Sequence, residues 1–167
     1  VGFNAWGGSS LADIRAPILI IGGYRDRTVG FQNGVRPVFD QARNAERYLL
    51  VFQNGGHAIG MTGAPPTMRS TLWDQDWFED PVWRHDRIMA IEQHMSTAFL
   101  DRFVKGQADR AAYLETDTPI SNSAVWPKDG PAAGYDVISP GGPGATWKGF
   151  RKNHGDGLEL HHKPPGA

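Results

Sequence analysis

The sequence predicts an α/β fold in which parallel strands are flanked by helices. Two apolar runs, residues 18–23 and 47–53, each lead directly into a turn that contains glycine and polar residues. The segment between them has the length and the apolar spacing of one short helix. This succession is a βαβ unit, which implies a parallel pair of strands and a right-handed crossover. The 167 residues are enough for one domain with a hydrophobic core.

A loop or short helix is expected at residues 1–16, before this unit. The first strand, "APILIIGG", is continuously apolar, which is typical of a parallel strand buried on both faces. Pro17 lies near its start, where a strand tolerates proline. The second strand is "RYLLVFQ", which has the same character. The helix between them has a proline in its first turn and one apolar face: Val35, Pro37, Val38, Phe39 and Ala42.

A loop at residues 58–79 leads to a long amphipathic helix, which we expect from about residue 81 to residue 105. Asp80 is expected to cap its N-terminus and Pro81 to lie in its first turn. Gly106 is the glycine expected to close the helix. The apolar residues of this helix recur every three or four positions: Ile88, Ile91, Met95, Phe99 and Phe103.

The periodic patterns weaken after about residue 110. We therefore expect a domain over residues 1–109 and a loop-rich C-terminal extension over residues 110–167. Trp147 and Phe150 are expected to dock the extension onto the domain, because disordered segments rarely carry such aromatic residues. Two short strands are expected within it: "YDVIS" (135–139) and "LELHH" (158–162).

Composition excludes several classes of function. The 17 basic and 18 acidic side chains nearly balance, so nothing indicates binding to nucleic acid or to an anionic membrane surface. No apolar run approaches the ~20 residues of a membrane-spanning helix. There are no cysteines, which excludes disulfides and thiolate metal sites and leaves the compartment open. The chain begins with Val1, which indicates processing or a piece of a longer protein.

Asp26 and His57 are the candidate catalytic residues, because each follows the end of one of the two strands. Open α/β sheets place their sites at the carboxyl ends of parallel strands. An imidazole there can act as a general base near neutral pH, and a neighbouring carboxylate can fix its tautomer. The alternative for Asp26 is a turn former that hydrogen-bonds only to its own backbone.

The block "LADIRAPILIIGGYRDRTVG…ERYLLVFQNGGHAIG" resembles the C-terminal half of an α/β-hydrolase. "GYRDRTV" is similar to the acid turn of that family, "NGGH" to its histidine turn, and "TAFLDRFVKG" to its final helix. The resemblance covers about residues 11–106, and within the family it is closest to dienelactone-hydrolase-like esterases. It implies that Asp26 is the triad acid and His57 the triad base, with no metal or organic cofactor.

The sequence departs from that family in having no G-x-S-x-G elbow. Ser9 and Ser10 follow two glycines, but no strand precedes them. We therefore expect the nucleophile and the oxyanion hole on a missing N-terminal half or on a partner chain. The resemblance then implies a serine hydrolase of carboxylic esters or similar acyl substrates, inactive as this fragment alone. The alternative is a non-catalytic, hydrolase-like module that binds a ligand or a partner.

The other polar clusters are weaker candidates. His161 and His162 are adjacent, so on a strand they point to opposite faces and cannot easily share a metal. An acidic group in the loop before the long helix is expected to be solvated rather than a metal site: Asp74, Asp76, Glu79 and Asp80. The aromatic residues of the same loop favour a packed loop over a substrate pocket: Trp73, Trp77 and Phe78.

Overall fold

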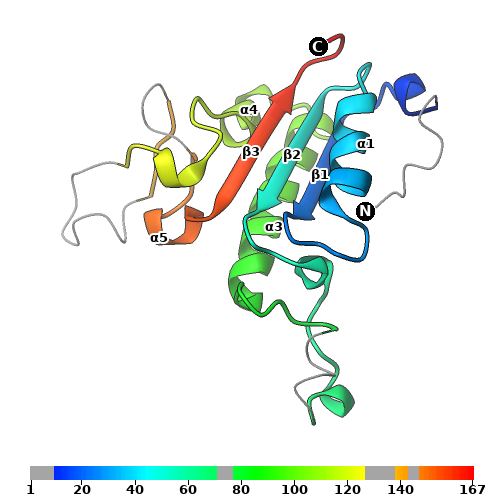
Figure 1. Ribbon diagram of the computed structural model, residues 1–167. Helices are drawn as coiled ribbons and strands as arrows, with labels where there is room; N and C mark the ends of the chain where they lie inside the picture. Colours follow the sequence, from blue (N-terminus) through cyan, green and yellow to red (C-terminus); the bar gives the residue numbers. More distant parts are fainter. Residues whose placement is uncertain (1–9, 71–76, 127–137, 143–146) are drawn as a thin grey trace.

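The computed structural model describes residues 10–70, 77–126, 138–142 and 147–167 of the chain (Figure 1). The fold is mixed α/β with one three-stranded sheet in the order β1-β2-β3. Strands β1 (Ile18–Gly23) and β2 (Arg47–Phe52) are parallel, with Ile18 opposite Arg47 and Gly23 opposite Phe52. The α/β class and the parallel pair predicted from the sequence are therefore confirmed.

Helices cover both faces of the sheet, which explains why β2 is apolar from Tyr48 to Phe52. Every residue of β2 is buried. Leu49 and Val51 pack with the helical segment η2 (Phe31–Val35) and helix α1 (Arg36–Gln41) on one face. The alternate residues of β2 pack with the long helix α3 (His85–Phe103) on the other face: Tyr48, Leu50 and Phe52. Figure 1 shows α1 and α3 on opposite sides of the strands.

Helix α3 starts at His85 rather than near residue 81, so the expected start is wrong by about one turn. Asp80 and Pro81 precede a non-helical segment, in which Arg84 has an extended backbone (φ −65°, ψ 133°). The carboxylate of Asp80 accepts hydrogen bonds from the backbone N–H groups of Val82 and Trp83, which form a separate turn before the helix. That turn carries Trp83 into the core, where it is 6% exposed.

The expected apolar face of α3 is confirmed for three of its residues and in part for the other two, Phe99 and Phe103, which pack partly buried against the same core. Ile88, Ile91 and Met95 are buried, whereas Phe99 is partly buried. Gly106 follows the last turn with φ of 72°, a left-handed conformation suited to glycine at a helix end.

The C-terminal extension adds strand β3 (Leu158–Lys163), which pairs antiparallel with β2. The strand expected at residues 158–162 is confirmed, and Trp147 and Phe150 join the core that α3 covers. Residues 135–137 of the other expected strand lie outside the described residues, and Ile138 forms only an isolated bridge with Arg151. Two short helices also lie in the extension: Ala111–Leu114 (α4) and Lys152–Gly155 (α5).

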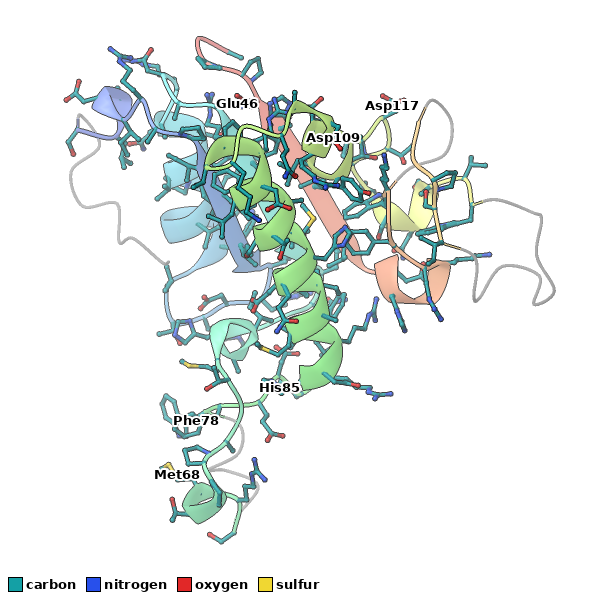
Figure 2. The ribbon with its side chains drawn as sticks, turned by 180° about the vertical axis from the view of Figure 1, so that it is seen from behind. Glu46, Met68, Phe78, His85, Asp109 and Asp117 are labelled. Atoms are coloured by element: carbon teal, nitrogen blue, oxygen red, sulfur yellow. The ribbon has the colours of Figure 1, made fainter. Side chains whose placement is uncertain are left out.

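Short 3-10 segments form the remaining helical structure of the described residues. They lie at Ser10–Asp13, His57–Gly60, Pro66–Met68, Ala108–Arg110 and Ser121–Ser123. The loop with Met68 and Phe78 projects beyond the N-terminal end of α3 (Figure 2). In the described parts of the chain, no helix has both the length and the apolar composition needed to cross a bilayer.

Candidate active site

Asp26 lies in a tight turn three residues beyond the end of β1. Its backbone N–H donates to the carbonyl of Gly23 at 3.1 Å. Its Oδ1 accepts the backbone N–H groups of Thr28 at 2.8 Å and Val29 at 3.0 Å. Asp26 is therefore a turn former, but its hydrogen bonds are not limited to its own backbone. Because one oxygen makes both of these bonds, the other carboxylate oxygen is left for a different partner.

His57 follows β2 through a glycine turn that touches the turn of Asp26. The N–H of Arg25 donates to the carbonyl of Gly55 at 2.8 Å, which ties the two turns together. The approach is so close that a Cβ built on Gly23 would lie 2.4 Å from the carbonyl oxygens of Gly55 and Gly56. Glycine at position 23 is thus what allows the two strand ends to deliver their side chains to one place.

The two side chains meet, with Nδ1 of His57 2.9 Å from Oδ2 of Asp26. The prediction that Asp26 and His57 lie close together at the ends of adjacent parallel strands is confirmed. The side chain of Asp26 is 8% exposed and that of His57 is 40% exposed. Burial raises the pKa of Asp26, but the hydrogen bonds from His57, Val29 and Thr28 outweigh it and hold this pKa below its usual value.

An ionised Asp26 accepts the proton of Nδ1, which leaves the lone pair of Nε2 available as a base. Among the described residues, no side chain or backbone group forms a hydrogen bond to Nε2. His57 borders a groove of about 590 Å³. The groove is also lined by Leu19 and Ile21 of β1 and by Phe99 of α3. Glu92 lines the same groove, and burial raises the pKa of its carboxyl group.

The loop before α3 reaches the other side of His57. Trp77, Pro81 and Thr28 line a second cavity of about 390 Å³ with His57. Trp77 is 72% exposed, so the expectation of a packed loop is wrong for this residue. Trp73, Asp74 and Asp76 lie outside the described residues.

Asp80 is partly exposed, and its carboxylate is also engaged by three backbone N–H groups. One of these donors is Gly56, immediately before His57, at 2.6 Å from Oδ2. Sequence reasoning missed this contact, since the two residues are 24 positions apart. Glu79 also contacts the backbone, accepting the N–H of Ala64 at 3.5 Å.

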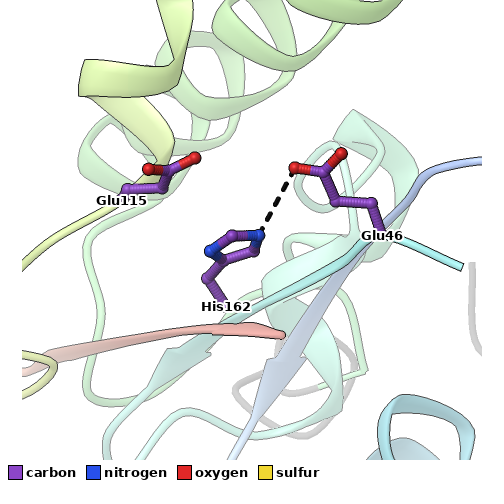
Figure 3. A group of neighbouring side chains, drawn as sticks. All are labelled: Glu46, Glu115 and His162. Atoms are coloured by element: carbon purple, nitrogen blue, oxygen red, sulfur yellow. Dashed lines mark ion pairs between the residues drawn. The ribbon is translucent and has the colours of Figure 1, made fainter. Parts of the chain in front are cut away.

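One group of possible metal ligands occurs among the described residues: Glu46, Glu115 and His162, with ligand atoms within 4.8 Å of one another (Figure 3). The guanidinium of Arg102 already donates to Glu46 at 2.9 Å and to Glu115 at 3.1 Å. His162 is 3.4 Å from Glu46 and stacks on Tyr48. This arrangement is an ion-pair cluster in which an internal cation holds the carboxylates.

In the described residues no hydroxyl group hydrogen-bonds to His57, so the serine–histidine contact of a Ser-His-Asp site is not formed there, although Ser96 and Thr28 line the cavities beside His57. Ser10 begins a 3-10 helix, and Ser9 lies outside the described residues.

Comparison of the chain with protein-family models, with curated proteins and with solved structures finds no match. The site consists of a carboxylate with an 8% exposed side chain that orients an accessible imidazole.

Proposed function

We propose that this chain supplies the acid and the base of a serine hydrolase of the α/β-hydrolase class, related to dienelactone-hydrolase-like esterases. The substrate is a carboxylic ester or a similar acyl compound. The observation that carries the proposal is the 2.9 Å contact between Oδ2 of Asp26 and Nδ1 of His57 at the ends of parallel strands. The βαβ arrangement and the long helix α3 packed on the sheet are consistent with the C-terminal part of that fold.

The reaction is acyl transfer. A serine hydroxyl attacks the acyl carbon while Nε2 of His57 accepts its proton, and Asp26 stabilises the imidazolium. The imidazolium then protonates the leaving alcohol, and a water molecule, deprotonated by the same nitrogen, hydrolyses the acyl-enzyme. These steps need Nε2 to be accessible, which agrees with the 40% exposure of the His57 side chain.

The proposal assigns the serine and the oxyanion-hole donors to a segment outside residues 1–167, in the same protein or on a partner chain. Strand β1 pairs only with β2 among the described strands, so its other edge is available for a further strand. The groove at His57 runs along that side of the sheet, beside Leu19 and Ile21. A strand added there would bring its carboxyl end close to Nε2 if it ran parallel to β1.

The test compares the isolated chain with the complete protein, using a p-nitrophenyl ester. The isolated chain is expected to show no hydrolysis above buffer. In the complete protein, His57→Ala should lower kcat by several orders of magnitude and Asp26→Asn by about 10⁴-fold. His154→Ala is the matched control, because its exposed side chain lies on the extension. If His57→Ala kept the turnover of the control, the catalytic assignment would be wrong.

The second candidate is a non-catalytic module of the same architecture that binds a ligand or a partner. It is favoured by the absence of a G-x-S-x-G motif from the 167 residues. A complete protein that bears no serine elbow and hydrolyses no ester would favour this candidate.

A further inference from the structure

The carboxylate of Asp80 joins two turns that are distant in the sequence. Its Oδ2 accepts the N–H of Gly56 at 2.6 Å. Its Oδ1 accepts the N–H groups of Val82 at 2.9 Å and Trp83 at 2.8 Å. One side chain therefore connects the turn that carries His57 to the turn that leads into α3.

The turn that contains Asp80 is anchored to the hydrophobic core through Trp83. Trp83 is 6% exposed, and its indole N–H donates to the carbonyl of Gln53 at 2.8 Å. Its ring meets Phe52 edge to face at 4.8 Å, and the guanidinium of Arg87 lies over it at 4.3 Å. Because Trp83 is fixed in this way, the turn that orients the carboxylate of Asp80 is fixed as well.

The glycine turn at residues 55–56 has little stiffness of its own, because glycine restricts its backbone least. On one side, the carbonyl of Gly55 accepts the N–H of Arg25 from the turn of Asp26. On the other side, the N–H of Gly56 donates to Asp80, its only acceptor among the described residues. These two contacts hold Gly55 and Gly56, the two residues that directly precede His57.

We propose that Asp80 is a positioning residue for His57, which holds the imidazole against Asp26 by fixing the N–H of Gly56. Both oxygens of Asp80 are engaged by backbone donors, so the residue acts through the turn and not by contact with the imidazole. The catalytic meaning of this role rests on the proposed hydrolase function. The geometric role does not depend on that function.

The first experiment uses the isolated chain and needs no activity. In Asp80→Asn, the amide oxygen should keep the two N–H donors Val82 and Trp83, so the NH₂ group faces Gly56 and that contact is lost. Hydrogen exchange at Gly56 should become at least about tenfold faster, because bonds to a carboxylate are among the stronger ones. The carboxyl pKa of Asp26, followed by ¹³C NMR, should rise, because the hydrogen bond from His57 helps to lower it.

Asp86→Asn is the matched control. Asp86 is an exposed carboxylate at the start of α3, paired with Arg84, and its loss should leave both readouts unchanged. If Asp80→Asn folds and leaves the pKa of Asp26 where the control leaves it, the positioning role is refuted. If it does not fold, Asp80→Glu is measured in the same way. The longer side chain cannot keep all three contacts, so an unchanged pKa of Asp26 again refutes the role.

The second experiment uses the complete protein. Asp80→Asn should lower kcat with little change in KM, whereas Asp86→Asn should change neither, because a displaced base affects the chemical step rather than substrate binding. If the protein hydrolyses no ester but the NMR results hold, the proposed function fails and the positioning of His57 stands. An active protein in which Asp80→Asn matches the control would overturn the inference.

Discussion

The tautomer of His57 should change when Asp26 is replaced by asparagine. Oδ1 of Asp26 is held by the N–H groups of Thr28 and Val29, so the oxygen of the new amide should keep that place. Its NH₂ group then faces Nδ1 of His57, which must become an acceptor and release its proton to Nε2. The same substitution would remove the free base that acyl transfer requires.

The expected size of this change follows from the exposure of the pair. Hydrogen bonds to charged groups contribute about 1.5 to 3 kcal/mol, and the 40% exposure of His57 favours the lower end. About 1.4 kcal/mol corresponds to a tenfold change in the ratio of the two neutral tautomers.

The ¹⁵N shifts of the ring nitrogens, measured at a pH where the imidazole is neutral, report this ratio directly. The exposed His154 provides an internal control in the same spectra. A ring that keeps its proton on Nδ1 after the substitution would refute the claim that Asp26 sets the tautomer.

Three further predictions concern stability. Met95→Ala should lower the free energy of unfolding by about 2 to 5 kcal/mol in urea titrations, because Met95 is fully buried over the sheet; a loss below about 1 kcal/mol would contradict this packing. Gly23→Ala should destabilise the chain and separate the two strand ends, since the new methyl group meets carbonyl oxygens at 2.4 Å; an unchanged ¹⁵N spectrum of His57 would count against it. Glu92→Gln should stabilise the chain at pH 7, because burial raises the folded-state pKa of Glu92 above its ordinary 4.5 and the ionised form is therefore disfavoured. That gain should vanish as the pH falls below 4.5, where both side chains are neutral, and a gain that persists there would have another cause.

Local sequence patterns were sufficient for the parts of the fold that depend on neighbouring residues. The unbroken apolar character of β2 predicted burial on both faces, and its pairing with β1 follows from the helix between them. The same logic placed Asp26 and His57 at one edge, because strand ends and glycine turns are visible in the sequence. Their contact needed no information about distant residues.

Features that depend on distant contacts could not be predicted in the same way. The pattern of "LELHH" indicated a strand, but nothing in it specifies β2 as the partner or an antiparallel direction. The Asp80-Pro81 pair has the composition of a helix start, yet the carboxylate forms a turn and also binds Gly56. Whether Asp80 starts the helix or forms a separate turn is decided by tertiary contacts, which local propensity does not include.

The pairing of β2 with β3 has a kinetic consequence during synthesis of the chain. The two strands are joined by a connection of more than 100 residues, whereas β1 and β2 are separated by a short one. At about 5 to 20 residues per second, a ribosome needs roughly 5 to 20 seconds to produce the chain from β2 to the end of β3. Over that interval one edge of a buried, largely apolar strand has no native partner, and unpaired edges of this kind recruit other chains. Nascent chains should therefore be most prone to aggregation just before β3 emerges, and most dependent on chaperones at that length.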